Sequence, residues 1–246
     1  MIHLSNKIIV VTGANGLLGK TLLLDIQKSG GIAINIDINN KTNIKKNIFC
    51  CDVTNEKKLD KVIEIIYKKF GKIDGWVNNA YPRTDDWNND FENILYDSWK
   101  KNIDLQLNSL FLCCQKVLIK MREQGFGNIV NIGSIYGIVG PDFKIYEDSK
   151  FTMPAAYSAI KGGVINFSRY LASYYGKYNL RINCVSPGGI YNNQHEDFVK
   201  KYSNNTPLNK MANADQISPA IIFLLSDFAD YITGHNLVVD GGWTII

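Results

Sequence analysis

Residues that bind metals are scarce in this sequence of 246 residues. Its three histidines lie far apart, and its five cysteines form no CxxC pair. Because a zinc site needs several such ligands close together, the sequence predicts no metal centre. Four of the cysteines form two pairs of direct neighbours, and the fifth stands in an apolar run, which is typical of reduced, packed thiols. This pattern predicts a cytoplasmic protein.

Long hydrophobic runs and charge of one sign are also missing. The apolar run in the N-terminal stretch MIHLSNKIIVVTG is too short for a signal peptide, and no segment approaches the length that crosses a membrane. The net charge is only +4, and the lysines are spread over separate segments without interleaved aromatic residues. The sequence therefore predicts neither a membrane protein nor a nucleic-acid-binding protein.

The chain does contain a regular alternation of short β-branched runs and longer helical patterns. With 46% hydrophobic and 20% charged residues, it can bury the core of one large domain. The expected strands read KIIVVTG, IAINID, NIFCCDV, KIDGWVNNA, NIVNIGS, LRINCVSPGG and NLVVDGG, and the expected helices cover residues 17–29, 55–70, 98–123, 157–178 and 214–227. This order predicts an α/β fold: a Rossmann-like, doubly wound parallel sheet of about seven strands in a three-layer αβα domain, residues 1–246.

The first strand runs directly into a glycine-rich turn. In IIVVTGANGLLGK, the residues Gly13, Gly16 and Gly19 lead into a helix, so backbone N–H groups and the helix N-terminus can approach a pyrophosphate. The second strand ends in Asp37, whose carboxylate suits the ribose hydroxyls of NAD and would repel the 2′-phosphate of NADP. The pattern favours NAD over NADP.

Two acidic residues near this turn have a second interpretation. Asp37 precedes INNK and is also typical of a turn, and Lys41 is close enough in sequence to assist a 2′-phosphate. Asp52 is expected to bond the adenine amino group while Val53 packs on the ring. Alternatively, Asp52 caps the helix that is expected from residue 55.

A tyrosine and a lysine four residues apart occur in PAAYSAIKGG. At this spacing, Tyr157 and Lys161 share one face of a helix. A phenol titrates near pH 10, and bringing its pKa to about 7 requires about 4 kcal/mol in favour of the phenolate. A cation about 4 Å away, at an effective dielectric constant near 20, supplies about that much. The pair is therefore suited to acid/base chemistry, although the same spacing also occurs on solvated helices without a function.

Six stretches occur in the order that is typical of one enzyme family. They are the glycine turn, VNNA at 77–80, NIGSIYG at 131–137, YSAIK at 157–161, INCVSPGG at 182–189 and LVVDGG at 237–242. On these stretches, the sequence resembles the short-chain dehydrogenase/reductase family over essentially its whole length. The resemblance implies an NAD(P)-dependent oxidoreductase that acts on CH–OH groups.

The same resemblance implies a set of catalytic residues. Tyr157 would pass a proton to or from the substrate oxygen, and Lys161 would hold the nicotinamide ribose and lower the tyrosine's pKa. Ser134 would hydrogen-bond the same oxygen, and Asn102 in WKKNID would anchor a water that leads the proton to solvent. Taken without the resemblance, Ser134 is a turn hydroxyl and Asn102 a solvent-facing helix amide.

The cofactor-binding residues are likewise implied by the resemblance. Asn79 would brace the central strand, and the backbone of Ile190 would meet the nicotinamide carboxamide. The whole set is Gly13, Asn15, Gly16, Leu17, Leu18, Gly19, Asp37, Asp52, Val53, Asn79, Ala80, Tyr157, Lys161, Pro187, Gly188 and Ile190.

The sequence departs from the family pattern in its glycine turn. Gly16 and Gly19 lie three residues apart, a spacing seen more often in the extended members that act on nucleotide sugars. Those members carry a longer C-terminal substrate domain, whereas this chain stops soon after VVDGG. We therefore expect the compact, single-domain type, with a nucleotide-sugar epimerase or dehydratase and a non-catalytic cofactor-binding sensor or scaffold as alternatives.

Three segments are expected to form substrate loops, at about residues 81–97, 138–156 and 190–212. The second lies between Ser134 and Tyr157, is longer than in the family, and is expected either to cover the site or to loop away from it. Aromatic and hydroxyl-binding groups suit a polyhydroxylated substrate. The candidate substrate-binding residues are Tyr81, Arg83, Lys144 and Tyr146.

The charges in these loops point to a substrate class. Arg83 or Lys144 can take a phosphate or carboxylate, the alternative being solvated loop charges. The stretches NNAYPRTDDW and IYEDSKFTMPAAYSAIKGG resemble those of bacterial dehydrogenases encoded with surface-glycan and flagellin-glycosylation genes. Together these features predict a small polar substrate, with a phosphorylated or amino sugar as the hypothesis, in carbohydrate biosynthesis.

The helices expected at 98–123 and 157–178 carry apolar residues around much of their circumference. A single stripe facing the sheet would need fewer apolar residues, so this pattern predicts contact with a second copy of the chain. The family resemblance likewise implies a homodimer or homotetramer built on these helices. The alternative is deep burial of both helices within one subunit.

Overall fold

The computed structural model of the protein describes residues 2–147 and 152–246. Seven strands form one parallel sheet in the order β3-β2-β1-β4-β5-β6-β7, which confirms the predicted doubly wound α/β fold. The strands are β1 (Ile8–Thr12), β2 (Ile32–Asp37), β3 (Ile48–Cys50), β4 (Gly75–Asn78), β5 (Gly127–Ile132), β6 (Leu180–Pro187) and β7 (Asn236–Val239). The helices are α1 (Leu17–Lys28), α2 (Glu56–Phe70), α3 (Tyr96–Ile103), α4 (Ser109–Gln124), α5 (Ala155–Tyr175), α6 (Glu196–Asn204) and α7 (Ala214–Leu225).

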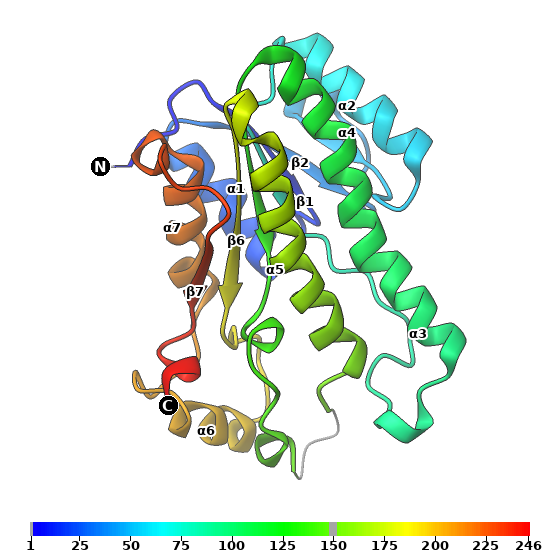
Figure 1. The fold of residues 1–246 in the computed structure, drawn as a ribbon, viewed down its shortest axis with the longest axis vertical. Helices are drawn as coiled ribbons and strands as arrows, with labels where there is room; N and C mark the ends of the chain where they lie inside the picture. Colours follow the sequence, from blue (N-terminus) through cyan, green and yellow to red (C-terminus); the bar gives the residue numbers. More distant parts are fainter. Residues whose placement is uncertain (1, 148–151) are drawn as a thin grey trace.

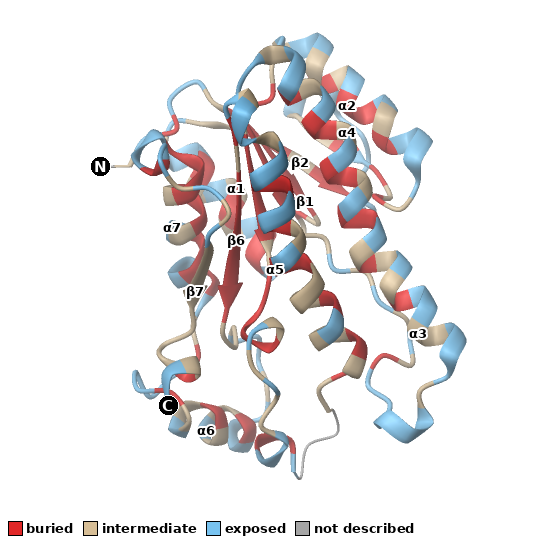
Figure 2. Cartoon of the chain, viewed as in Figure 1, coloured by how far each residue is buried: buried red, intermediate tan, exposed pale blue. Residues whose placement is uncertain are grey.

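Helices cover both faces of the sheet (Figure 1). Alternate residues of β1 point to opposite sides: Ile8 and Val10 join the core under α2, α4 and α5, and Ile9 and Val11 join the core under α1 and α7. The central strands are largely buried, the edge strand β7 is partly buried, and the outer faces of the helices are exposed (Figure 2). Burying each large aliphatic side chain stabilises the fold by about 1.5–3 kcal/mol, so these two cores hold the three layers together.

Helix α2 shows how local sequence sets one of these elements. The side chain of Asn55 accepts a hydrogen bond from the N–H of Lys58 and caps the helix, and Gly71 ends it in a left-handed conformation with φ of +74°. Between these ends, the apolar side chains recur at helical spacing and face the sheet; they are Leu59, Val62, Ile63 and Ile66. The predicted boundaries, residues 55–70, therefore match closely.

Two helical regions differ from the sequence prediction. The helix expected at 98–123 begins at Tyr96 and contains a π-helical turn, Asp104–Asn108, between α3 and α4. Helix α6 lies within the segment predicted as a substrate loop at 190–212. This helix buries only Phe198 and Tyr202, and two buried positions give too weak a periodic signal to predict a helix.

The order of the strands reverses between β1 and β4, which are direct neighbours in the sheet although β2 and β3 lie between them in sequence. Ligands of doubly wound sheets bind at this point, beyond the carboxyl ends of the strands. Among residues 2–147 and 152–246, no helix is long and apolar enough to cross a membrane.

Candidate active site

The glycine turn packs tightly against the end of β4. Gly13 has φ of +61°, and a Cβ there would lie 2.7 Å from the Cα of Ala80, so this position requires glycine. The side-chain amide of Asn79 donates to the carbonyls of Thr12 at 3.0 Å and Gly13 at 2.9 Å. These contacts join the carboxyl ends of β1 and β4, the two strands at which the order reverses.

The turn presents the N-terminus of α1 to the space outside the sheet. Gly16 is the N-cap residue and supplies no side-chain cap, so the first N–H groups of the helix are free to bind an anion. A Cβ at Gly19 would lie 2.6 Å from the carbonyl oxygen of Gly13, so this glycine allows the helix to pack on the turn. The residues present therefore fit a diphosphate.

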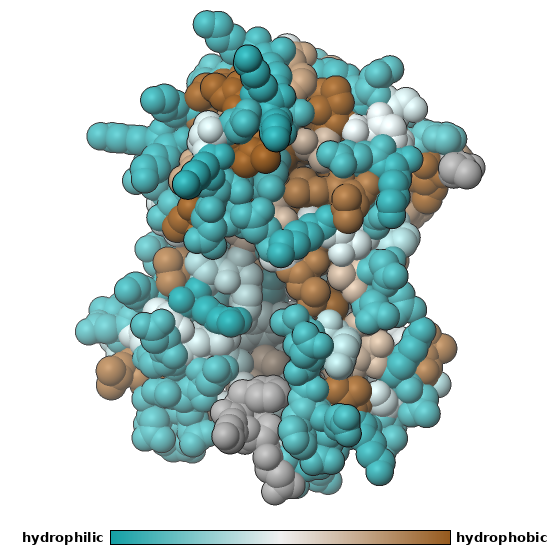
Figure 3. All heavy atoms as spheres, turned by 180° about the vertical axis from the view of Figure 1, so that it is seen from behind, coloured by the Kyte–Doolittle hydropathy of each residue, from teal (hydrophilic) through white to brown (hydrophobic). Residues whose placement is uncertain are grey.

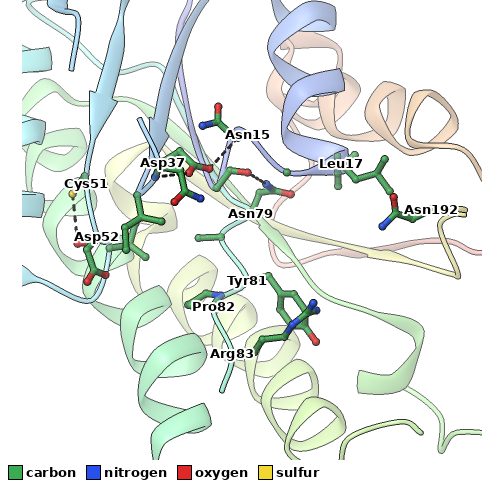
Figure 4. A pocket seen from close by; sticks show the side chains of 17 residues that line it. Asn15, Leu17, Asp37, Cys51, Asp52, Asn79, Tyr81, Pro82, Arg83 and Asn192 are labelled. Carbon is green, nitrogen blue, oxygen red and sulfur yellow. Dashed lines mark hydrogen bonds between the residues drawn. The ribbon is translucent and has the colours of Figure 1, made fainter. Parts of the chain in front are cut away.

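Asp37 lies at the carboxyl end of β2 and is buried. One carboxylate oxygen accepts a 3.0 Å hydrogen bond from the backbone N–H of Asn15, and the other accepts a 2.9 Å bond from the N–H of Asn39. Each oxygen keeps a further lone pair that can accept from a ribose hydroxyl. Asp37 thus faces the turn at the place where the sequence predicts the adenosine ribose (Figure 4).

Asp52 does not cap helix α2, because the cap is Asn55. One oxygen of Asp52 accepts hydrogen bonds from the N–H of Thr54 at 2.9 Å and from its hydroxyl at 2.7 Å. This turn places Asp52 and Val53 beside the cavity in which Asp37 lies.

Two adjoining cavities lie at the carboxyl ends of the strands. The molecule is visibly hollowed between its main body and its lower part when seen from behind (Figure 3). The first cavity has a volume of about 610 Å³ and is lined by the glycine turn, the end of β2 and the segment after β4. From the predicted cofactor-binding set it brings together Gly13, Asn15, Gly16, Leu17, Leu18, Asp37, Asp52, Val53, Asn79 and Ala80.

The second cavity has a volume of about 640 Å³ and shares residues with the first, among them Leu18, Tyr81 and Arg83. Side chains from α5, from the end of β5 and from α6 meet in it. The predicted residues that line it are Ser134, Tyr157, Lys161, Pro187, Gly188, Ile190 and Tyr146. The two volumes together suit an extended dinucleotide and a small substrate.

Tyr157 and Lys161 lie on the same face of α5, as predicted, but the lysine meets the ring of the tyrosine. Lys161 Nζ is 5.5 Å from the centre of the Tyr157 ring and donates a 2.7 Å hydrogen bond to the carbonyl of Ile132. Burial lowers the pKa of Lys161 to about 8. Burial raises the pKa of Tyr157, and a hydrogen bond with Ser134 offsets part of that rise.

Asn102 is buried and engaged with the 81–97 loop. Its amide nitrogen donates to the Thr84 hydroxyl at 2.8 Å and to the Ser98 carbonyl at 3.0 Å, and its amide oxygen accepts from the Thr84 N–H at 3.2 Å. These bonds fasten the loop to α3, a role that the family resemblance did not imply.

Gln106 is a residue that the sequence reasoning missed. It lies in the π-helical turn and is buried, and neither its amide oxygen nor its amide nitrogen has a hydrogen-bond partner among the described residues. The neighbouring Leu107 packs against Gly163 of α5, two residues after Lys161. A polar residue four positions after Asn102, on the same helical face, was the signal in the sequence.

The candidate substrate residues fall into two groups. Tyr81 packs edge to face against both Trp87 and Tyr157, with ring centres 5.8 and 5.7 Å apart, and Arg83 lies over the Tyr81 ring at 5.5 Å. The Tyr146 hydroxyl lies 3.0 Å from that of Tyr136, and both side chains line the second cavity. Lys144, in contrast, is exposed to solvent and lines neither cavity. Its predicted role in binding substrate therefore has no support.

Part of the second cavity is lined by aromatic residues that the sequence reasoning did not single out. They are Tyr136 from the turn after β5 and Phe198 and Tyr202 from α6; Met211, from the segment before α7, lines the cavity beside them. Of the predicted 138–156 loop, residues 148–151 lie outside the described part of the chain. Thr152, Met153 and Pro154 line the second cavity, so the end of this loop borders the site.

Comparisons with known proteins show which proteins this chain is similar to. Residues 23–244 match the family model described as enoyl-(acyl carrier protein) reductase. Post-translational flagellin modification protein A of Campylobacter coli is 36% identical over 98% of this chain and 99% of its own. The 7alpha-hydroxysteroid dehydrogenase of Bacteroides fragilis is 33% identical over 100% of this chain and 97% of its own. A crystal structure of a short chain dehydrogenase from Leptospira borgpetersenii with bound NAD+ is 32% identical, with a TM-score of 0.89 over 98% of this chain and 94% of that one.

Proposed function

Because this chain belongs to the short-chain dehydrogenase/reductase family, we propose that it is an NAD-dependent oxidoreductase that interconverts an alcohol and a ketone on a small polar substrate. The observation that carries the proposal is the convergence of Ser134, Tyr157 and Lys161 in one cavity that adjoins the glycine turn. The bound nicotinamide would supply the hydride chemistry.

Side chains of this protein would bind the substrate oxygen, transfer its proton and hold the cofactor. The Ser134 hydroxyl and the Tyr157 phenol meet at the place where a substrate oxygen would bind, so one can hold the oxygen while the other transfers its proton. Lys161 projects from the same face of α5 and can donate to ribose hydroxyls. Asp37 and the N-terminus of α1 would hold the adenosine ribose and the pyrophosphate.

Gln106 is proposed to hold a water that continues the proton path from Lys161 towards solvent. Buried polar groups almost always have a partner, and a residue with two free amide atoms is a suitable site for an ordered water. π-Helical turns are frequent at functional sites. This assignment gives Gln106 the water-binding role that the family resemblance implied for Asn102.

The substrate is proposed to be a sugar with a charged substituent, in surface-glycan biosynthesis. Arg83 lies at the junction of the two cavities with its cationic group free of any carboxylate partner among the described residues, so a phosphorylated sugar is favoured over a free amine. Aromatic walls suit the apolar faces of a sugar ring. The flagellin modification protein of Campylobacter coli, similar over its full length, supports the glycan setting.

A panel of sugars, sugar phosphates and nucleotide sugars, assayed at 340 nm with NAD and with NADP, tests the proposal. We expect NADH to accumulate with at least one substrate. Interconversion of a nucleotide sugar without release of NADH would instead favour the epimerase or dehydratase that the spacing of Gly16 and Gly19 suggests.

The protein is also proposed to assemble as a homodimer or homotetramer in the cytoplasm. Exposed and half-buried aromatic rings follow one another along α4 and α5, where Phe111 contacts Phe167 at a tilt, Phe167 stacks on Tyr170 and Tyr170 stacks on Tyr174. Tyr170 and Tyr174 are 61% and 50% exposed, more than a single subunit needs to leave uncovered. All five cysteines are free thiols, which suits a reducing compartment.

A further inference from the structure

Three asparagines beside Asp37 bind one another in a closed ring. The amide nitrogen of Asn15 donates to the amide oxygen of Asn40 at 2.9 Å, that of Asn40 donates to Asn35 at 2.7 Å, and that of Asn35 donates to Asn15 at 3.1 Å. Within the ring, each side chain gives one hydrogen bond and receives one. The ring is therefore complete within itself and carries no charge.

The ring joins three parts of the chain that are separate in sequence. Asn15 belongs to the glycine turn, Asn35 to β2 and Asn40 to the connection between β2 and β3. Asn40 also donates to the carbonyl of Phe49 in β3 at 3.0 Å. The ring thus fixes the glycine turn relative to the ends of both β2 and β3.

The position of Asp37 depends on this ring. The backbone N–H of Asn15 donates to Asp37 (Figure 4). The residue that holds the carboxylate is therefore itself held by its own side chain in the ring. A carboxylate with a fixed orientation can accept from the two adjacent ribose hydroxyls without first losing conformational freedom.

The surroundings of the ring are unsuited to a 2′-phosphate. A phosphate needs cationic partners, whereas the charged group that is hydrogen-bonded to a residue of the ring is the carboxylate of Asp37. Among the described residues that line the first cavity, the cation is Arg83, which lies with Tyr81 after β4, away from Asn15 and Asp37 (Figure 4). Neutral amides occupy the place where a phosphate site would require basic residues.

We propose that the ring of Asn15, Asn35 and Asn40 is a positioning element that makes the protein selective for NAD. This inference rests on the proposed dinucleotide-dependent function. It assigns the selectivity to a group of neutral amides that presents Asp37, in addition to the charge of Asp37 itself.

The substitution Asn35→Asp tests the ring directly. A carboxylate cannot donate, so however the other two amides turn, one contact in the ring becomes oxygen against oxygen. We expect NADH binding, measured by calorimetry, to weaken about 3- to 10-fold, which corresponds to the loss of one or two net hydrogen bonds. In turnover, the KM for NAD should rise by the same factor while kcat at saturating NAD changes by less than about twofold.

Asn43→Asp is the matched control. Asn43 lies in the same connection after β2, is exposed, and uses its side-chain oxygen to accept from the N–H of Lys46, which a carboxylate does equally well. This variant adds the same charge near β2 without touching the ring, and it should bind NADH like the wild type. Equal weakening by Asn35→Asp and Asn43→Asp would overturn the proposal, because charge alone would then explain both.

A double-mutant cycle gives a second test that does not depend on one variant folding. Removing any one side chain disrupts the whole hydrogen-bonded ring. The double variant Asn35→Ala/Asn40→Ala should therefore weaken NADH binding little more than either single substitution. Additive losses would contradict the ring. Because the readout is binding, a wild type that binds neither NADH nor NADPH refutes the proposed function, whereas equal binding of both refutes only the selectivity.

Discussion

The Nζ of Lys161 lies over the face of the Tyr157 ring, 5.5 Å from its centre. In this position the cation does not offset the burial of the phenol, and burial raises the pKa of Tyr157. The sequence suggested that the lysine alone would bring the phenol towards neutrality. In the proposed function, the positive charge of an oxidised nicotinamide held in this cavity would favour the phenolate and so assist proton release from Tyr157.

The substitution Tyr157→Phe should abolish turnover and leave NADH binding largely intact. In the proposed function the phenol hydroxyl transfers the proton, a contribution of about 10²- to 10⁴-fold, whereas the phenylalanine ring of the variant can still pack against Tyr81 and Trp87. Steady-state kinetics at 340 nm and calorimetry with NADH measure the two effects separately. Turnover of the variant within a few fold of the wild type would refute the assigned role.

Because of Lys161, the free energy of unfolding should increase as the pH rises. Its folded pKa of about 8 lies below the unfolded value of 10.5, so between these values the unfolded chain binds more protons and folding becomes more favourable. We expect the free energy of unfolding of the wild type to gain about 2–3 kcal/mol relative to Lys161→Met between pH 7 and pH 10. Urea unfolding of both proteins at the two pH values measures this. A difference independent of pH would show that the lysine titrates normally.

Buried tyrosines change the free energy of unfolding with pH in the opposite direction. The effect of Lys161 therefore has to be measured as a difference from Lys161→Met. The pKa values of Tyr136, Tyr146, Tyr157 and Tyr202 are raised by burial, so above pH 10 the unfolded chain loses protons that the folded chain keeps, and stability falls. Both proteins share these tyrosines, so the difference between them isolates the lysine.

Local patterns predicted the strands, the glycine turn and the Tyr157–Lys161 face, because each depends on residues close together in sequence. Other features depend on where separate segments meet. Asn15 and Asn35 are twenty residues apart, and no periodic pattern relates them. Lys144 and Tyr146 stand two residues apart in one short helical turn, yet one is exposed and the other lines the cavity. Packing against α6 sets the orientation of this short helical turn, and the sequence did not predict α6.

Replacing Gln106 with methionine should separate its function from its packing. Methionine has a similar length and removes two buried amide atoms that lack partners among the described residues, so the free energy of unfolding should stay equal or rise by about 1–3 kcal/mol. If the amide holds a water for proton transfer, kcat should nevertheless fall about tenfold or more. Unchanged kcat in a stable variant would exclude the relay role.

Asn102→Ala provides the contrasting variant. It removes the hydrogen bonds to Thr84 and Ser98, so the loop that carries Tyr81 and Arg83 should loosen and unfolding should become easier by about 1–3 kcal/mol. The KM for the organic substrate should rise more than kcat falls.

Arg83 should act on the organic substrate. In Arg83→Ala the KM for an anionic sugar should rise about tenfold or more, because a charge-assisted hydrogen bond contributes about 1.5–3 kcal/mol, while the affinity for NADH stays unchanged. Arg83→Lys should recover part of the loss, since lysine keeps the charge without the planar fork. Equal loss of NADH affinity would place the guanidinium on the cofactor's phosphates.

Assembly should depend on the aromatic rings that stack along α4 and α5. Tyr170 is 61% exposed and stacks on both Phe167 and Tyr174, so a carboxylate introduced by Tyr170→Glu would be buried without a partner if two copies met on this face. We expect light scattering to show a dimer or tetramer for the wild type and a smaller species for the variant. Tyr231→Glu, at a fully exposed tyrosine outside these helices, is the control for added charge. If both variants keep the wild-type mass, the α4–α5 face is not the interface, and the stacked rings cover only their own subunit.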